Sequence, residues 1–539
     1  MKELLLNKAN KKAILMGNEA IVRGALEQGV DFVSTYPGTP ASEIGNIFFK
    51  LSQNRNYKGY FEFSTNEKVA LEAGIGASFS GLKTLVTMKN FGVNVALDAL
   101  IPFVYTGVKG PTVIVAADDP SCHSSAQSEE NTRLISYLAH IPTLEPSDPQ
   151  ECKDFVKLAF QVSEKFKIPV LVRTTTRVAH QRAVVRLDKL VLRKARSGKF
   201  IKNFQQFVTL PPRVLEMKKE LLEKTEKIRK FSENRLKVEP ENQSGKTGII
   251  TSGVSYLYVK EGLRELGLDL PVLKLDFFYP LAEEEIKKFI GRLNKVLVVE
   301  ELEPCLEKEV ERLAKKTNCR LKIMGKNLLP ETGELKPENV SFAIAKTVNK
   351  RFEIKNVEIK KRKPRLCPGC PYWFVVSAVK KAVDVKKTIF GGEIGCYMLF
   401  GSPSVSMQDY LSCMGSSVGI GHGIKKASGQ KLIAFVGDSS FFHSGIPALV
   451  NSVFNKSNPL IIILENQTTA MTGHQPHPGA PLLPDGISIE NIVRACGVKH
   501  VKTLDPVKQE EFVKTIKDFL KKPEVAVIIS KRPCIQLKK

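Results

Sequence analysis

The segments FVGDSSFFHSG (residues 435–445) and LIIILENQTTAMTGHQPHPG (residues 460–479) decide the fold of the C-terminal part of this chain. Asp438 ends an apolar run in the first segment, and Asn466 ends another in the second. The spacing of these two residues is that of a strand–helix–strand crossover. Because parallel strands joined in this way end at the same edge of a sheet, we expect both side chains to emerge at neighbouring strand ends.

The residue types at these strand ends favour a magnesium–diphosphate site. Mg²⁺ prefers oxygen ligands in octahedral geometry and commonly shares phosphate oxygens, which suits the Asp438 carboxylate and the Asn466 amide oxygen. Gly437 lets the backbone approach a diphosphate, and the helix that begins nearby presents free N–H groups. An isolated Gly-Asp-Ser can instead be a turn and a helix cap after a strand, so the cofactor interpretation depends on the second segment.

The pair resembles the thiamine diphosphate motif, in which a Gly-Asp-Gly or Gly-Asp-Ser is followed one crossover later by an Asn. The longer strings GDSSFFHSG and NQTTAMTGHQPHPG resemble the large (alpha) subunit of the indolepyruvate ferredoxin oxidoreductase family in particular. The resemblance implies that thiamine diphosphate is held by Gly437, Asp438, Ser439, Asn466 and Thr468. It also implies that Asp438, Asn466 and the backbone carbonyl of Thr468 bind Mg²⁺.

Four further residues of these segments are candidates for supporting roles. Glu465 fills the place before the Asn where the family usually has a carboxylate or an Asn. His443, His474 and His477 can serve as acids or bases on the substrate side, and His474 is assigned to catalysis. A His in a loop is more often a structural hydrogen-bonding group, and that alternative stays open for all three.

The N-terminal part alternates helical stretches with short apolar runs, including residues 84–88, 112–116 and 169–172, which is an α/β pattern. We assign residues 1–195 to a first domain. Its segment STNEKVALEAGIGASF (residues 64–79) resembles the family's pyrimidine-binding domain and implies that Glu67 bonds N1′ of the aminopyrimidine. Glu72 is the competing candidate. Without the resemblance, Glu67 would be read as a surface carboxylate in a first helical turn.

Two loops of the first domain are candidates for substrate binding. The segment YPGTPASE (residues 36–43) looks like the family's YPGTP substrate loop, which implies that Thr39 contacts the 2-oxoacid carboxylate; a plain chain reversal is the alternative. The segment DDPSCHSSAQSEENTR (residues 118–133) is a polar loop after a strand. Its polar side chains are available to a carboxylate or pyrophosphate, although a capped loop leading into a helix is an equal alternative. They are Ser124, Ser125, Gln127 and Arg133.

The rest of the chain predicts two more units. Residues 214–236 have the apolar spacing of an amphipathic helix, and VEPENQSGK (238–246) is typical of a linker, so 196–244 is assigned to a helical linker. Residues 245–345 are assigned to a transketolase-C-terminal-like domain and 360–539 to the diphosphate-binding domain. The fold class is therefore α/β, with two thiamine diphosphate-binding-fold domains flanking a smaller Rossmann-type domain.

The ten cysteines, in a chain without a secretory signal, argue for reduced, buried or metal-bound thiols. Cys367 and Cys370 form a CxxC that suits zinc, a redox pair or an iron–sulfur cluster. In 2-oxoacid:ferredoxin oxidoreductases a CPGC, a GIGC and a late PC hold the proximal [4Fe–4S] cluster. The resemblance implies the same for Cys367, Cys370, Cys396 and Cys534. Buried structural cysteines are the alternative, and Cys413 is the substitute ligand.

Composition limits the class of protein. The chain has 539 residues, 42% of them hydrophobic and 25% charged, which is typical of a folded globular protein of several domains. No signal-peptide core or membrane-length apolar run is present, so we predict a cytoplasmic protein without a membrane partner. The net charge of +25 includes the basic run 360–363. Without exposed aromatics or a known module, this charge favours an acidic electron carrier over nucleic acid as a partner.

The resemblance implies oxidative decarboxylation of an aryl 2-oxoacid to its acyl-CoA through the thiamine diphosphate ylid, with electrons passed to ferredoxin and a smaller beta subunit as partner. A non-oxidative 2-oxoacid decarboxylase is the alternative, and a nucleic-acid-binding protein is a third hypothesis. The family's large subunits normally continue into a ferredoxin domain with two CxxCxxCxxxCP runs, which this sequence lacks. A separate ferredoxin-like polypeptide, a shortened chain and a lost redox function are the three explanations left open.

Overall fold

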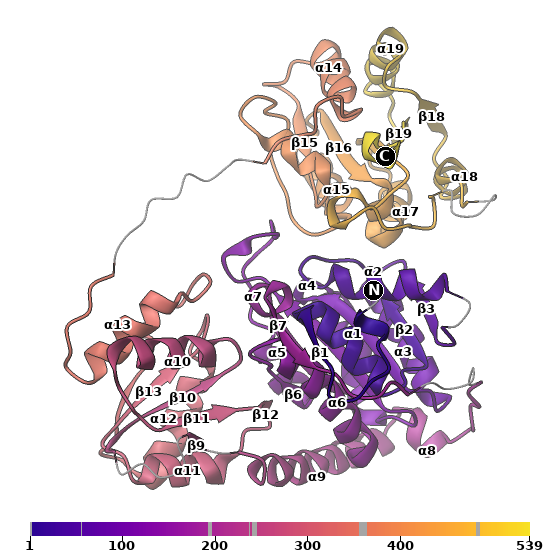
Figure 1. Ribbon diagram of the computed structural model, residues 1–539. Helices are drawn as coiled ribbons and strands as arrows, with labels where there is room; N and C mark the ends of the chain where they lie inside the picture. Colours follow the sequence, from indigo (N-terminus) through magenta and orange to yellow (C-terminus); the bar gives the residue numbers. More distant parts are fainter. Residues whose placement is uncertain are drawn as a thin grey trace. The chain divides into compact units, whose positions relative to one another are not determined.

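The computed structural model describes residues 3–54, 57–191, 197–236, 238–239, 245–354, 364–480 and 486–538. It divides into two compact units, Met1–Val357 and Glu358–Lys539, which are described separately (Figure 1). The basic run 360–363 lies outside the described residues. In the described parts of the chain, no helix is both long and apolar enough to cross a membrane.

A seven-stranded sheet forms the centre of the N-terminal part, in the order β12-β6-β7-β5-β4-β2-β3. All neighbouring pairs are parallel except β12 with β6. The strands are β2 (Phe32–Thr35), β3 (Tyr60–Phe63), β4 (Thr84–Lys89), β5 (Thr112–Asp118), β6 (Thr143–Leu144), β7 (Val170–Thr175) and β12 (Phe277–Tyr279). The strands predicted from the apolar runs are confirmed as β4, β5 and β7.

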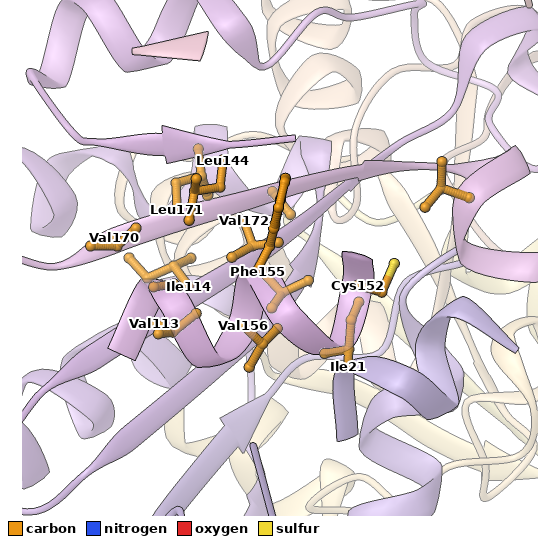
Figure 2. Close-up of a cluster of buried hydrophobic side chains, with 14 of the residues drawn as sticks. Ile21, Val113, Ile114, Leu144, Cys152, Phe155, Val156, Val170, Leu171 and Val172 are labelled. Atoms are coloured by element: carbon orange, nitrogen blue, oxygen red, sulfur yellow. The ribbon is translucent and has the colours of Figure 1, made fainter. Parts of the chain in front are cut away.

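Helices follow most strands of this sheet. They are α1 (Gly17–Glu27), α2 (Ser42–Ser52), α3 (Glu67–Phe79), α4 (Asn90–Thr106), α5 (Arg133–Ala139), α6 (Pro149–Phe166) and α7 (Thr176–His180). The side chain of Asp148 caps α6 by accepting a 2.8 Å hydrogen bond from the N–H of Glu151. Cys152 and Phe155 on α6 lie among buried side chains of β5 and β7 (Figure 2). Burial of such apolar side chains is the dominant stabilisation of the sheet.

Two more strands, β1 (Lys12–Met16) and β8 (Arg182–Arg186), form an antiparallel pair in the N-terminal part. The short helix α8 (Phe204–Phe207) completes this part. Helix α9 (Arg213–Glu233) follows and contacts α4, α6 and α11 (Glu283–Gly291). It confirms the helix predicted at 214–236. Met217, Leu221 and Ile228 are buried. Leu215 and Leu222, which belong to the predicted apolar stripe, are exposed.

The central sheet has the order β14-β13-β10-β11-β9 and is parallel except for β9. Its strands are β9 (Val238–Glu239), β10 (Thr247–Ser252), β11 (Val272–Leu275), β13 (Lys295–Val299) and β14 (Lys322–Met324); the helices around it are α10 (Ser255–Leu266), α11, α12 (Cys305–Thr317) and α13 (Pro337–Thr347). The start of the predicted linker 238–246 is therefore a strand. Its pairing with β11 is long-range and has no local sequence signal.

A five-stranded parallel sheet, in the order β15-β16-β17-β19-β18, forms the second unit. Its strands are β15 (Ile389–Gly391), β16 (Leu432–Gly437), β17 (Leu460–Glu465), β18 (His500–Leu504) and β19 (Ala526–Lys531). One face packs against α14 (Tyr372–Ala382) and α19 (Gln509–Phe519). The other packs against α15 (Ser416–Ser428), α17 (Ile446–Phe454) and α18 (Ile489–Ala495).

These sheets confirm the predicted α/β class. The domain bounds 1–195, 196–244, 245–345 and 360–539 stay a prediction. Two of the sheets are linked more closely than those bounds imply, because β12 belongs to the central segment by sequence but pairs with β6 of the N-terminal sheet.

Candidate cofactor site

Asp438 and Asn466 lie at the ends of adjacent parallel strands, with Gly437 paired in register with Leu464. Asp438 is the first residue of the short helix α16 (Asp438–Ser440), and its side chain is buried. Its Oδ1 accepts the N–H of Ser439 at 2.8 Å. Its Oδ2 accepts the N–H groups of Asn466 and Gln467 at 2.9 and 2.7 Å. The carboxylate therefore ties the two strand ends together.

The amide of Asn466 is held in one orientation by two hydrogen bonds. Its nitrogen donates to the Tyr372 hydroxyl at 2.8 Å, and its oxygen accepts the N–H of Thr468 at 3.1 Å. The oxygen thus faces the turn that follows β17. In the same turn the hydroxyl of Thr469 donates to the hydroxyl of Ser439 at 3.0 Å, which joins the two segments a second time. Glu465, one residue earlier, pairs with Lys531 at 2.8 Å.

Gly437 is required at its position by a close approach of Tyr397. A Cβ atom on Gly437 would lie 2.9 Å from Cε1 of Tyr397. The Tyr397 hydroxyl accepts the Gly437 N–H at 2.8 Å and donates to Glu393. Any side chain at 437 would therefore push the strand end out of register with its neighbours.

Glu393 is a buried carboxyl group that the sequence reasoning missed. It accepts the N–H groups of Gly415 and Gly437 at 2.9 and 3.3 Å, and so connects the loops that precede α15 and α16. Burial raises the pKa of Glu393 to about 8, although these N–H groups oppose the shift. The available signal was a Glu just after the short strand β15, following Gly392 and preceding Gly395, in a segment that leads to a strand end.

The three candidate histidines have different surroundings. His443 is buried, and its Nδ1 lies 2.5 Å from the Ser444 hydroxyl. His474 is exposed, with a φ of 61°, in the loop after β17. The side chain of His477 is buried, and its Nε2 lies 3.2 Å from Oδ2 of Asp438. Only His477 is placed directly against the Asp438 carboxylate by these contacts.

The four cysteines Cys367, Cys370, Cys396 and Cys534 line one cavity of about 130 Å³. Asn466, Tyr372 and His474 line the same cavity. The expected substitute ligand Cys413 does not line it; that thiol is exposed in the loop before α15. The volume is similar to that of engineered cavities, about 150 Å³, that admit benzene. The cavity therefore suits a compact group several atoms across.

The thiols of this cavity repel one another's negative charge. Burial raises the pKa of Cys370 to about 11, with Cys367 and Cys534 adding to the effect. Burial raises the pKa of Cys396 to about 12, and the other three thiols contribute. Within the described ranges, no three His, Cys, Asp or Glu side chains converge closely enough to hold a single metal ion. The set instead has the donor chemistry of a cluster that binds four separated thiolates.

Glu67 in the first unit begins α3 and is buried, and its neighbour Asn66 caps the helix by accepting the N–H of Val69 at 2.9 Å. A Cβ atom on Gly92, in the first turn of α4, would lie 2.5 Å from Cγ and 2.9 Å from Oε1 of Glu67. Glycine at 92 thus makes room for this carboxylate. The competing Glu72 is exposed and forms an ion pair with Lys68.

The two candidate substrate loops of the first unit meet. The Ser124 hydroxyl donates to the carbonyl oxygen of Thr39 at 3.1 Å. Asp119 holds the polar loop by accepting the Ser125 hydroxyl proton at 2.6 Å and the Ser124 N–H at 2.8 Å. Oδ2 of Asp119 shares the single Ser124 hydroxyl proton with the Thr39 carbonyl. Lys89, at the end of β4, donates to the Ser124 carbonyl at 3.1 Å. Gln127 lies in the same loop, without a hydrogen bond described for its side chain.

The expectation that Arg133 is available to an anionic ligand is wrong. Its guanidinium group is buried and binds Glu145 through two 2.7 Å hydrogen bonds, and it contacts Glu300 at 3.2 Å. Burial would raise the pKa of Glu145, but Arg133 and Arg173 outweigh it and lower the value to about 2. Arg133 therefore joins the N-terminal sheet to the central one. The polar sequence around it gave no sign of these distant partners.

Glu301 belongs to the same buried group of charges. Burial raises its pKa to about 7, although Arg173 and the N–H of Leu335 act in the opposite direction. Its Oε1 accepts that N–H at 3.1 Å. The junction between the two sheets of the first unit thus contains a carboxyl group that changes charge near neutral pH.

Comparison with known proteins gives two family matches and several relatives. Residues 23–230 match a family described as pyruvate flavodoxin/ferredoxin oxidoreductase, thiamine diP-bdg. Residues 393–530 match the thiamine pyrophosphate enzyme, C-terminal TPP binding domain. Both thiamine diphosphate-binding domains predicted from the sequence are thereby confirmed.

The chain is 43% identical to the indolepyruvate oxidoreductase subunit IorA of Methanothermobacter marburgensis, over 97% of this chain and 87% of that protein. It is 39% identical to the subunit of the same name from Pyrococcus horikoshii, over 98% and 87%. A solved 2-oxoglutarate:ferredoxin oxidoreductase from Magnetococcus marinus shares the fold, with 16% identity, a TM-score of 0.51, and coverage of 62% of this chain and 65% of that one. Given the identity and coverage of these relatives, the chain belongs to the indolepyruvate oxidoreductase subunit IorA family.

Proposed function

We propose that this chain is the catalytic subunit of an enzyme that oxidatively decarboxylates an aryl 2-oxoacid of the indolepyruvate type to its acyl-CoA, with ferredoxin as electron acceptor. The relatives are named for indolepyruvate, and the similar solved structure is described with 2-oxoglutarate, coenzyme A and succinyl-CoA bound. One observation within this chain carries the redox part of the proposal. Asn466 and four cysteines line a single cavity, which supports placing the proposed cofactor ligand next to the proposed ligands of an electron carrier.

Asp438, Asn466 and the carbonyl of Thr468 are the proposed Mg²⁺ ligands, and Gly437 and Ser439 are the proposed backbone contacts of the diphosphate. The donor set fits, because a carboxylate and two neutral oxygens leave coordination positions for phosphate oxygens. Gly437 ends β16 and Ser439 lies in the first turn of the helical segment that follows, where backbone N–H groups favour an anionic ligand. When bound, thiamine diphosphate supplies the carbanion chemistry; the protein supplies binding and orientation.

Glu67 is the proposed carboxylate for N1′ of the aminopyrimidine, where it shares a proton with the ring. Two observations support Glu67 over Glu72. Glu67 is buried beside a glycine that leaves room for it, whereas Glu72 is exposed and already paired with Lys68. A buried carboxyl group keeps a fixed geometry and is shielded from water, both of which favour proton transfer at one defined atom.

Thr39 is proposed to bind the carboxylate of the 2-oxoacid. Its loop is supported by Ser124, which bonds the Thr39 carbonyl, and by Lys89, which bonds the Ser124 carbonyl. This leaves the Thr39 side chain on a braced backbone, as a substrate contact requires. His474, which lines the cysteine cavity and is exposed, is the proposed acid or base on the substrate side.

Cys367, Cys370, Cys396 and Cys534 are the proposed ligands of a [4Fe–4S] cluster. The raised pKa values of Cys370 and Cys396 mean that neither thiol ionises unaided at neutral pH, so a positively charged group is needed to hold both as thiolates. Such a cluster would pass single electrons outward to ferredoxin. A smaller beta subunit is the proposed partner, since the relatives are named as subunits.

The test is anaerobic purification of the chain with its partner subunit, followed by measurement of iron, sulfide and thiamine diphosphate per chain. Indolepyruvate and CoA are then added, and reduction of ferredoxin is followed. About four irons per chain and CoA-dependent reduction are expected. Fewer than about three irons per chain would contradict the cluster. Release of an aldehyde without acceptor reduction would favour the non-oxidative decarboxylase instead.

A further inference from the structure

His477 has an imidazole whose tautomer and orientation are set by its surroundings. The side chain is 3% exposed. Its Nδ1 accepts the backbone N–H of Gly479 at 3.2 Å. A ring nitrogen that accepts carries no proton, so in the neutral imidazole the proton lies on Nε2. The ring of Phe442 lies beside it, with ring centroids 6.0 Å apart. The residue is therefore a fixed N–H donor.

The Nε2 atom has no hydrogen-bond partner among the described residues. It lies 3.2 Å from Oδ2 of Asp438, but not in a hydrogen-bonding angle. That oxygen already accepts the N–H groups of Asn466 and Gln467. A buried donor without an acceptor is costly in a folded protein and is normally satisfied by water, an ion or a ligand. The missing acceptor must therefore reach the space beside the Asp438 carboxylate.

We propose that His477 donates its Nε2–H to an oxygen of the thiamine diphosphate's diphosphate group, which rests on the cofactor site described under Proposed function. An anionic oxygen is the acceptor that gives the strongest hydrogen bond to a neutral N–H. In the proposed site Asp438 would share Mg²⁺ with the diphosphate, which would bring an oxygen of the diphosphate close to this carboxylate. His477 is then a cofactor-binding residue and not an acid or base for the substrate.

The test uses the full-length chain with its partner subunit, stripped of cofactor, and two variants of His477. H477F removes both ring nitrogens and keeps an aromatic ring, whereas H477Q keeps an N–H donor at the position of Nε2. H500F is the matched control, because His500 lies at the start of β18 and its ring packs against Phe519, with ring centroids 6.2 Å apart. The dissociation constant for thiamine diphosphate is measured at saturating Mg²⁺.

We expect H477F to weaken thiamine diphosphate binding about 10- to 100-fold, the range for a hydrogen bond to a charged group, and H477Q to recover most of it. Cofactor-free H477F also loses the Nδ1 acceptor of the Gly479 N–H, so its melting temperature is measured to separate a loss of stability from a loss of affinity. Unchanged affinity in H477F would overturn the proposal. A lowered melting temperature with equal loss in H477F and H477Q would assign His477 a purely structural role.

A measurement on the unmutated protein covers the case in which H477F does not fold. With ¹⁵N-labelled histidine, the Nε2–H signal of His477, identified by its absence in H477Q, should shift on addition of inorganic pyrophosphate with Mg²⁺ and not on addition of thiamine. No shift with pyrophosphate would refute the proposal. If the wild type binds no thiamine diphosphate at all, the proposed function fails and not this inference alone.

Discussion

Replacing Gly92 with alanine tests whether the position of Glu67 controls the reaction. The new Cβ would lie 2.5 Å from Cγ of Glu67, whereas carbon atoms in contact stay about 3.5–4.0 Å apart. The carboxyl group must therefore move by about 1 Å. A misplacement of that size at a reacting group can lower the rate about 100-fold. Alanine also favours a helix over glycine by up to about 1 kcal/mol, so the fold of α4 should survive.

The assay is hydrogen–deuterium exchange at C2 of bound thiamine diphosphate, with unfolding by urea measured in parallel. The matched control is Gly76→Ala in α3, where a Cβ would meet nothing within 4 Å. We expect normal exchange for G76A and about 100-fold slower exchange for G92A, with thiamine diphosphate still bound. If G92A exchanges at the wild-type rate while Glu67→Gln does not, the packing argument is wrong. If neither variant is slowed, Glu67 is not the pyrimidine carboxylate.

Three further predictions concern other parts of the molecule. Tyr372→Phe removes the acceptor that orients the Asn466 amide, so the Mg²⁺ concentration needed for half-maximal thiamine diphosphate binding should rise about 10- to 100-fold; an unchanged requirement would contradict this. In chemical analysis, Cys396→Ser should lose iron and keep thiamine diphosphate, whereas the control C413S should keep both. Loss of both groups in C396S would count against separate sites. Glu301→Gln should stabilise the protein toward urea by about 3 kcal/mol at pH 8 and not at pH 4.5. Because the pKa of Glu301 is raised on folding, the stability that its protonated form contributes is lost as the pH rises from 4.5 to about 7. An equal gain in the free energy of unfolding at both pH values would refute this prediction.

The sequence predicts those parts of the fold that are determined by residues close together along the chain. The strands at β4, β16 and β17 are short apolar runs bounded by polar or glycine residues, and such runs carry their own signal. The adjacency of Asp438 and Asn466 followed from the length of one crossover. Those inferences needed no knowledge of distant segments.

The features that the sequence analysis predicted wrongly or missed depend on contacts between segments that are far apart in the sequence. Arg133 sits in a polar stretch, and only the fold brings Glu145 and Glu300 against it. Strand β9 lies in a segment rich in turn-forming residues and forms because β11 offers an edge. Glu393 is buried because two glycine N–H groups from other loops converge on it. The gathering of four cysteines into one cavity was suggested by family motifs, since their separation in sequence has no periodicity that would bring them together.

The pairing of β12 with β6 limits where this chain can be cut. Strand β6 contains two residues, and its outer neighbour β12 is made much later during synthesis. Until that segment leaves the ribosome, the N-terminal sheet keeps an open edge that other chains can pair with. A recombinant fragment that stops at residue 195 is therefore expected to aggregate, whereas one that continues past the central sheet should be monodisperse in gel filtration.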